Sequence, residues 1–176
     1  MSCIVGLVDN GKVFIGGDSA ASNDTFIQTL QAHKVFRVGP VLIGCAGSHR
    51  VLQILRHKLD LEESALETEE YVVSHVIEKI RETFKEKGVL QALPEGEEFE
   101  GTFLLGYKGR LFTVCSDFSA QEYVDGCDSI GSGREYALGS MAATYQLPPE
   151  ERIILALTVA ARYSPSVCQP FYVEVL

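Results

Sequence analysis

The sequence has 176 residues, of which 46% are hydrophobic, so it can build one compact domain with a buried core and is not typical of a disordered chain. Its formal charge of −9 disfavours a general nucleic-acid binder, which needs a basic surface. The longest apolar run, Ile153–Ala161, is well short of the roughly 20 residues that cross a bilayer, so we expect no membrane segment. No signal peptide precedes the first predicted strand, and we expect a cytoplasmic protein.

The cysteines and histidines do not predict a metal site. The five cysteines are odd in number, are scattered and never form a C-x-x-C pair, and the four histidines show no ligand spacing. We favour buried free thiols in a reducing compartment over a disulfide framework or a zinc site, and we expect neither metal nor cofactor. The cysteines are Cys3, Cys45, Cys115, Cys127 and Cys168.

The first twenty residues predict a β-hairpin. A β-rich run over Ser2–Val8 and a return strand over Val13–Gly17 flank an Asn-Gly pair, which is a strong hairpin signal. A two-residue turn at this pair places Cys3 opposite Asp18 and Ser2 one position further out. Asp18 is therefore expected beside the start of the chain.

A second hairpin is predicted around a Gly-Pro pair. Lys34–Val38 and Val41–Cys45 are its strands, and a two-residue turn places Lys34 opposite Cys45. Lys34 and Gly44 then share the open end of this hairpin.

Helices alternate with these hairpins along the chain. The repeated order of antiparallel strand pairs and helix pairs favours an α+β fold, with two antiparallel sheets packed together and helix pairs outside, over a doubly wound parallel sheet. We treat residues 1–176 as a single domain, and residues 89–100 as a loop because they are rich in Pro, Gly and Glu. The further predicted elements are a helix over Ser48–Leu59, a helix from Thr68 as N-cap to Gly88, a hairpin of Thr102–Tyr107 with Arg110–Cys115, a helix opened by Gly131-Ser132-Gly133 that reaches about Tyr145, a helix from Pro149 and a strand over Phe171–Val175.

Ser2 is a candidate nucleophile. A small residue after Met1 permits removal of the initiator methionine, which would leave a serine with a free α-amine. Such an amine has a pKa of about 7.7–8.0 and can act as a base toward a hydroxyl of the same residue. Cys3 is a rival nucleophile, but it would lack the terminal amine and should point to the opposite face of the sheet.

Asp18 and Lys34 are candidates for a charged pair beside Ser2. A buried lysine near the nucleophile would lower the pKa values of its hydroxyl and amine, and Asp18 would hold the lysine in place. The alternative for each residue is an ordinary solvent-exposed position at the end of a strand.

The segment Gly131-Ser132-Gly133 is not a dinucleotide-binding loop. The third glycine of that fingerprint would fall at Tyr136, late in the chain and outside any βαβ unit. The segment instead predicts a helix N-terminus, capped by Ser132, which can accept a polar ligand group.

These motifs together resemble the proteasome β-subunit family, and most closely its bacterial branch of HslV-like peptidases. Asp18 and Lys34 follow Ser2 at successive intervals of sixteen residues, and the motifs occur in the order of that family. They cover about residues 1–60 and 120–145, whereas residues 60–120 align only by type of element. The motifs are Ser2-Cys3-Ile4-Val5-Gly6, Gly17-Asp18-Ser19-Ala20-Ala21-Ser22, Lys34-Val35-Phe36, Gly44-Cys45-Ala46-Gly47 and Ile130-Gly131-Ser132-Gly133.

The resemblance implies a four-layer αββα sandwich and acyl transfer to an N-terminal nucleophile. Ser2 takes the place of the family's threonine, with Asp18 and Lys34 as its charged pair. Gly44 takes the place of the glycine whose N–H stabilises the oxyanion, and Ser132 with Gly133 takes the place of the segment that hydrogen-bonds the terminal amine. The substrate would be a peptide or an unfolded polypeptide, and the assembly a homo-oligomeric ring or double ring that an AAA+ unfoldase can feed.

Two departures from that pattern stand out. Serine lacks the methyl group that restricts χ1 of threonine, so the nucleophile is less preorganised. The family's second supporting aspartate has no clear match in the segment Arg162–Ser166, where Ser164 or Ser166 could substitute.

Three functions remain open at this point: a self-compartmentalising peptidase, a non-catalytic ring or scaffold protein of the same fold, and a small N-terminal-nucleophile amidase. The pair Asp18 and Lys34 favours the first over the second, because a scaffold has no evident need for it. Oligomeric mass would separate the amidase.

Overall fold

The computed structural model describes residues 2–23, 25–94 and 96–176. Its elements come in antiparallel strand pairs and helix pairs, as the sequence predicts. The strands are β1 (Cys3–Asp9), β2 (Lys12–Gly17), β3 (Ala20–Ser22), β4 (Ile27–Thr29), β5 (Val35–Val38), β6 (Val41–Gly47), β7 (Leu90–Leu93), β8 (Gly96–Phe99), β9 (Gly101–Tyr107), β10 (Arg110–Val114), β11 (Ala120–Gln121), β12 (Cys127–Gly131) and β13 (Tyr172–Val175). The helices are α1 (His49–Lys58), α2 (Thr68–Tyr71), α3 (Glu78–Glu86), α4 (Arg134–Ala143) and α5 (Pro149–Tyr163), and a π-helical segment over Val72–Ile77 joins α2 to α3.

Two antiparallel sheets face each other. One has the strand order β12-β1-β2-β13 and the other β11-β10-β9-β6-β5. The predicted registers of the hairpins are confirmed, since Ile4 pairs with Gly17 and Val35 pairs with Gly44. The mixed α/β class with antiparallel sheets is confirmed as well.

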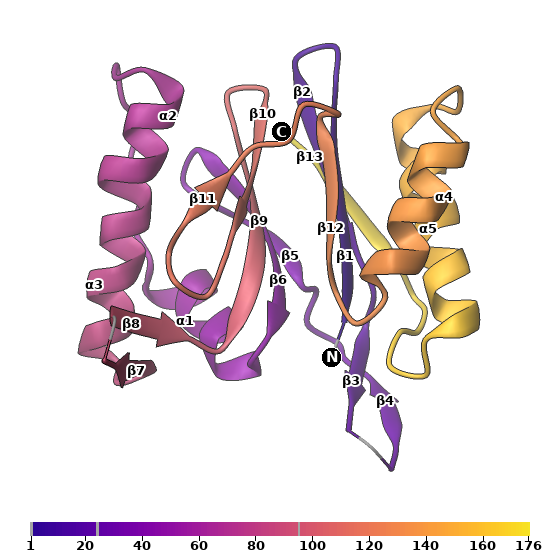
Figure 1. The fold of residues 1–176 in the computed structure, drawn as a ribbon, viewed down its shortest axis with the longest axis horizontal. Helices are drawn as coiled ribbons and strands as arrows, with labels where there is room; N and C mark the ends of the chain where they lie inside the picture. Colours follow the sequence, from indigo (N-terminus) through magenta and orange to yellow (C-terminus); the bar gives the residue numbers. More distant parts are fainter. Residues whose placement is uncertain (1, 24, 95) are drawn as a thin grey trace.

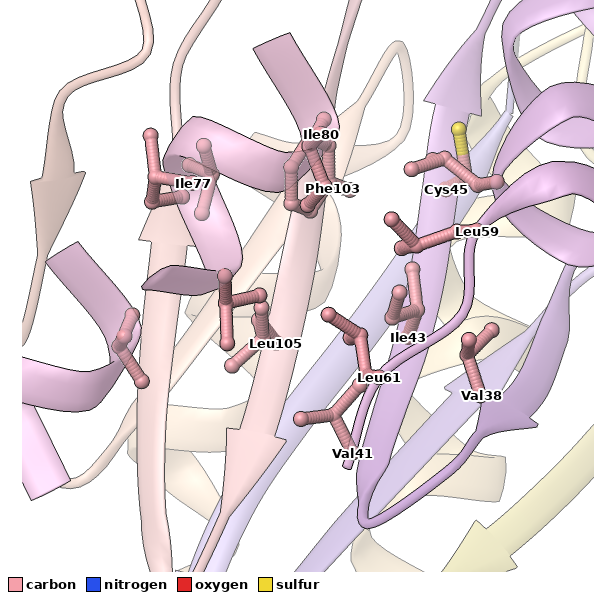
Figure 2. Packing of buried hydrophobic residues seen from close by; sticks show 14 of the residues in the cluster. Val38, Val41, Ile43, Cys45, Leu59, Leu61, Ile77, Ile80, Phe103 and Leu105 are labelled. Carbon is pink, nitrogen blue, oxygen red and sulfur yellow. The ribbon is translucent and has the colours of Figure 1, made fainter. Parts of the chain in front are cut away.

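Helices cover the outer face of each sheet (Figure 1). Helices α1–α3 lie over the five-stranded sheet, where the side chains of Ile77 and Ile80 pack toward Phe103 and Leu105 (Figure 2). Helices α4 and α5 lie over the four-stranded sheet. A third apolar cluster, with Ile4 among its members, fills the space between the two sheets. Burial of each aliphatic or aromatic side chain contributes about 1.5–3 kcal/mol to the free energy of folding. The three apolar clusters therefore hold the two sheets and their helices in fixed positions.

Two local predictions are wrong. Residues 89–100 were expected as a loop, but Leu90–Leu93 and Gly96–Phe99 pair as a hairpin, and Phe99 anchors it in the core under α3. The N-cap of α2 is Glu67 and not Thr68, because the Glu67 carboxylate accepts hydrogen bonds from two N–H groups of the first turn.

Candidate functional site

Ser2, Asp18 and Lys34 meet in the structure although they come from three segments of the chain. The Nζ atom of Lys34 donates to Ser2 Oγ at 2.9 Å and to Asp18 Oδ1 at 2.8 Å. The side chains of Lys34 and Asp18 are 1% and 0% exposed, and Ser2 is buried as well. The sequence-predicted charged pair therefore lies directly beside the predicted nucleophile.

The first two hairpins bring these residues together. Asp18 follows the last residue of β2, and its backbone N–H donates to the Cys3 carbonyl at 3.2 Å, which continues the β1–β2 ladder. Lys34 precedes β5, and its carbonyl accepts from Cys45 N–H at 3.0 Å. Gly17 lets the hairpins approach closely, because a Cβ there would lie 2.8 Å from the Ile4 side chain and 3.1 Å from that of Val35.

Asp18 is held by backbone donors as well as by Lys34. Its Oδ1 accepts from Cys3 N–H at 2.9 Å, and its Oδ2 accepts from Ala20 N–H at 2.9 Å and Cys168 N–H at 3.4 Å. Burying an ion pair costs several kcal/mol per ion unless hydrogen bonds replace the lost water. These three N–H groups supply that replacement, so the carboxylate has a fixed position from which it orients Lys34.

Ser132 and Gly133 contact the backbone of Ser2. Ser132 Oγ and Gly133 N–H donate to the Ser2 carbonyl at 3.2 and 3.3 Å. The resemblance implied contacts to the amine of Ser2, whereas the contacts described here reach its carbonyl. Gly131 has φ of +90°, and a Cβ at this position would lie 2.3 Å from the Ser2 carbonyl oxygen, so only glycine permits the approach.

Ser132 does not cap α4, contrary to the sequence prediction. The N-cap is Gly133, and the Ser132 hydroxyl lies 2.6 Å from Ser166 Oγ, which lies 3.2 Å from Ser164 Oγ. Ser164 and Ser166 are buried. A chain of hydroxyl groups thus lies where the resemblance implied a second aspartate. The sequence prediction left open whether Ser164 or Ser166 substitutes for that aspartate, and both belong to this chain of hydroxyl groups.

The backbone of Gly44 does not suit its predicted role as oxyanion donor. Cys45 N–H donates to the Lys34 carbonyl, on the side of β6 that faces β5. Because N–H directions alternate along a strand, Gly44 N–H points to the opposite side, toward its register partner Leu104 in β9. By the same alternation, we expect Gly47 N–H to point in the direction of Cys45 N–H. Because β5 begins only at Val35, the Gly47 N–H group faces past the end of that strand, on the side where Lys34 lies.

The sequence reasoning did not select Gly47, because the motif Gly44-Cys45-Ala46-Gly47 does not show which of its N–H groups a neighbouring strand will occupy. The registers of both neighbours of β6 were needed, and the pairing with β9 was not predictable from the turn residues. The motif contains both Gly44 and Gly47, but the sequence alone does not show which of the two has an N–H group that faces Lys34.

Cys3 does not compete as nucleophile. Its side chain packs in the cluster under α4 and α5, on the face of β1 opposite to the inter-sheet space, and its Sγ lies 3.8 Å from Ser129 Oγ. Burial raises the pKa of the Cys3 thiol to about 12, so the thiol stays protonated.

His49 is a further residue near the site that the sequence reasoning did not select. It begins α1, two residues after Gly47, and its side chain is exposed at the surface. Partial desolvation, with the positive charge of Lys34 as the second cause, lowers the pKa of the His49 imidazole. The ring is therefore more often neutral near pH 6.5 than a free histidine.

The described parts of the chain contain no group of three or more His, Cys, Asp or Glu side chains that could hold a metal ion. Among the helices of the residues described, none is long and apolar enough to span a membrane.

Comparison with known proteins gives matches in structure only. No protein-family model and no curated protein matches the sequence. The chain is similar to BPH of Thiobacillus denitrificans, whose structure is in complex with epoxomicin, with a TM-score of 0.83 and 23% identity over 99% of this chain and 97% of that chain. It is also similar to eukaryotic HslV from Trypanosoma brucei, with a TM-score of 0.72 and 21% identity over 99% and 98% of the two chains.

A third similar structure is Anbu, the ancestral β-subunit, from Yersinia bercovieri, with a TM-score of 0.72 and 16% identity over 98% of this chain and 80% of that chain. All three neighbours have the proteasome-type fold, and the alignments cover almost the whole of this chain. The chain therefore has the proteasome-type fold, the fold of the family that its motifs resemble.

Proposed function

We propose that this protein is a proteasome-like peptidase that uses Ser2 as an N-terminal nucleophile after removal of Met1. The observation that carries the proposal is the buried Lys34 ammonium, which hydrogen-bonds to Ser2 Oγ and to the Asp18 carboxylate at once. Met1 itself lies outside the described residues. An ammonium group that donates to a hydroxyl lowers the pKa of that hydroxyl, so its proton is transferred more readily to a base.

In the proposed mechanism, the α-amine of Ser2 takes the hydroxyl proton, directly or through water. The Ser2 Oγ atom then bonds to the peptide carbonyl carbon. The positive charge of Lys34 stabilises the developing alkoxide, and Asp18 keeps Lys34 in position. The amine passes its proton to the leaving nitrogen as the C–N bond breaks, which leaves an ester on Ser2. Water hydrolyses this ester, and the proton it loses restores the hydroxyl.

We assign the oxyanion contact to Gly47 N–H in place of Gly44. The Gly47 N–H group faces the Lys34 side of the sheet, whereas that of Gly44 faces β9. A single oxyanion donor is typically worth about 3–4 kcal/mol of transition-state stabilisation. Ser132, Gly133 and Ser166 hold the Ser2 backbone so that Oγ and the amine stay aligned.

The wider setting is part of the same proposal. We assign the two sheets and their helix layers to a single four-layer αββα domain over residues 1–176, working in the cytoplasm. The assembly would be a homo-oligomeric ring or double ring that encloses the sites. Its substrates would be peptides or unfolded polypeptides, with an AAA+ unfoldase as a possible supplier.

A non-catalytic ring or scaffold protein is the second candidate. The observation in its favour is the absence of an acidic residue in the segment 162–166, where the resemblance implied a supporting aspartate. A small N-terminal-nucleophile amidase is the third candidate, and it would differ in oligomeric mass.

The proposal is tested by intact mass spectrometry after treatment with epoxomicin, the compound in the BPH complex. We expect loss of Met1 and one adduct, which peptide mapping places on residue 2. Ser2→Ala is the matched variant, which should lose Met1 and take no adduct. Retained Met1 without an adduct, in protein that is folded by circular dichroism, would favour the scaffold.

A further inference from the structure

A polar cavity lies between the two sheets, and one of the residues that line it, Gly131, lies against the backbone of Ser2. The inner faces of the sheets are apolar along most of their length, with Leu104, Leu111 and Ile130 in contact there. On the same two faces, the polar side chains of Thr113 and Asp128 line a cavity of about 200 Å³. A cavity of about 150 Å³ holds a benzene molecule, so this one has room for a single side chain.

Asp128 gives the cavity a buried negative charge. Its side chain is 4% exposed. Oδ2 accepts from Thr113 Oγ1 at 2.6 Å, and Oδ1 is reached by the Arg134 guanidinium only at 3.4 Å. A carboxylate can accept about four hydrogen bonds, so Asp128 keeps acceptor capacity for a ligand within the cavity.

The other polar walls are compatible with a cationic ligand. Arg134 is 45% exposed and is anchored elsewhere, through Nε to the Ser129 carbonyl at 2.8 Å, so it does not neutralise Asp128 fully. Tyr123 supplies an aromatic ring, fixed by a hydrogen bond of 2.7 Å from its hydroxyl to Gln121. An ammonium group is attracted by both a carboxylate and an aromatic face.

The cavity adjoins the candidate nucleophile. Gly131 lines it, and the same glycine lies against the Ser2 carbonyl oxygen, which a Cβ would approach to 2.3 Å. For a substrate whose carbonyl reaches Ser2 Oγ, the subsite proposed below requires a neighbouring side chain to extend past Gly131 into the cavity.

We propose that this cavity is a substrate subsite that binds a lysine side chain within a few residues of the scissile bond, with Asp128 as the residue that determines the preference. The proposal rests on the proposed peptidase function, because only then is the occupant a substrate side chain. A bound lysine ammonium would donate to the free lone pairs of Asp128 while its methylene chain contacts the wall around Ile130.

Cys115 lines the same cavity and is partly exposed, so it can report on the charge there without catalysis. We would measure rates of mixed-disulfide formation with methanethiosulfonates of equal size that carry an ammonium or a sulfonate group, and with the neutral methyl reagent. The ammonium-to-sulfonate ratio at Cys115 should be about tenfold higher than at the partly exposed Cys168. Equal ratios, or no reaction with the neutral reagent, would overturn the subsite.

Two substitutions should move this ratio in opposite directions. Asp128→Asn keeps an acceptor for Thr113 and should reduce the ratio at Cys115 about tenfold, whereas Arg134→Gln should raise it. Both charged reagents react with the same thiolate, so their ratio cancels any change in thiol reactivity, and the rate with the neutral reagent reports access to Cys115. A ratio that Asp128→Asn leaves unchanged in folded protein contradicts the assignment.

Peptide cleavage then separates this inference from the function it rests on. Lysine, norleucine and glutamate would be placed in turn at each position around a cleaved bond. We expect lysine to lower KM relative to norleucine at one position, and Asp128→Asn to abolish that difference. Cleavage without any lysine preference refutes the subsite alone. A charge-dependent ratio at Cys115 in a protein that neither cleaves peptides nor reacts with epoxomicin supports the cavity and refutes the peptidase.

Discussion

Lys34 is the residue on which the candidate site depends most, because one ammonium group holds the hydroxyl of Ser2 and the carboxylate of Asp18. A lysine that is almost fully buried is rare in proteins and needs a partner. Here the partner is itself fixed by backbone N–H groups, so the pair has little freedom to rearrange.

Replacing Lys34 by methionine should destabilise the protein by about 3–5 kcal/mol, because Asp18 would remain buried without its counter-ion. Urea unfolding measures this change. Lys12→Met, at an exposed position, is the control and should change stability by less than about 0.5 kcal/mol.

The double variant Lys34→Met with Asp18→Asn makes the test specific. It should be less destabilised than the sum of its two single variants, since it removes both buried charges. Simple additivity of the two losses would mean that the ion pair does not account for them.

His49 should make stability depend on pH below its ordinary pKa of 6.5. Because its pKa is lowered in the folded protein, the unfolded chain binds the proton more readily, and stability falls as the pH decreases from 6.5 through the folded pKa. The variant His49→Gln should lack this component. Comparing urea midpoints of the two proteins at pH 7.5 and pH 5.5 tests it, and an identical pH dependence would refute the assignment.

At the scale of single residues, the register of the first hairpin predicted that Asp18 lies beside Ser2, and the register of the second placed Lys34 beside Gly44 and Cys45. That Lys34 also lies beside Ser2 was implied by the family resemblance, because no turn determines how the two hairpins pack together.

The sequence did not resolve Gly47 from Gly44, because that choice depends on the pairing of β6 with β9, which no local turn determines. The link from Ser132 to Ser166 likewise depends on how the segment after α5 lies against the segment between β12 and α4.

Strand β12 positions Ser2 from the side opposite to β2. Its last residue, Gly131, pairs with Cys3 and has a positive φ, and the Ser2 carbonyl lies against it. The close approach of two backbones is thus an element-level requirement of the site, and it permits Ser132 and Gly133 to bond to Ser2.

Gly131→Ala should cost about 2–4 kcal/mol of stability and displace Ser2, because the new Cβ would overlap a backbone oxygen at an unfavourable φ. Gly88→Ala is the matched control. It also has positive φ, at +66°, but nothing lies within 4 Å of its Cβ, and it should cost about 1 kcal/mol.

Thermal unfolding and epoxomicin labelling would be measured on both variants. We expect labelling of Ser2 to be lost in Gly131→Ala and retained in Gly88→Ala. Equal effects of the two substitutions would show that the contact with Ser2 has no special role.

The order of elements followed from hydrophobic periodicity and turn residues, which are local signals. The β7–β8 hairpin was missed because its Pro- and Glu-rich sequence has little strand propensity, and tertiary contacts of Phe99 under α3 outweigh that. The short strands β3 and β4 were missed for a similar reason, since three residues are too few for a periodic pattern.

At the scale of the whole molecule, the β3–β4 hairpin extends away from the two sheets (Figure 1). Phe26 and Ile27 on this hairpin are 55% and 42% exposed, and all three residues of β4 are exposed. A two-stranded hairpin alone is only marginally stable in water. The hairpin also begins at Ala20, whose N–H bonds to Asp18, so its position is linked to the candidate site.

We therefore predict that another copy of the chain covers this hairpin in an oligomer. Native mass spectrometry should give multiples of the 19.3 kDa chain, allowing for loss of Met1. Ile27→Lys should shift the distribution toward smaller species and slow epoxomicin labelling of Ser2, whereas Lys58→Glu, a substitution at the exposed end of α1, should do neither. A monomer at micromolar concentration would contradict an enclosed chamber, and the peptidase, if active, would then have to work on substrates that reach an open site.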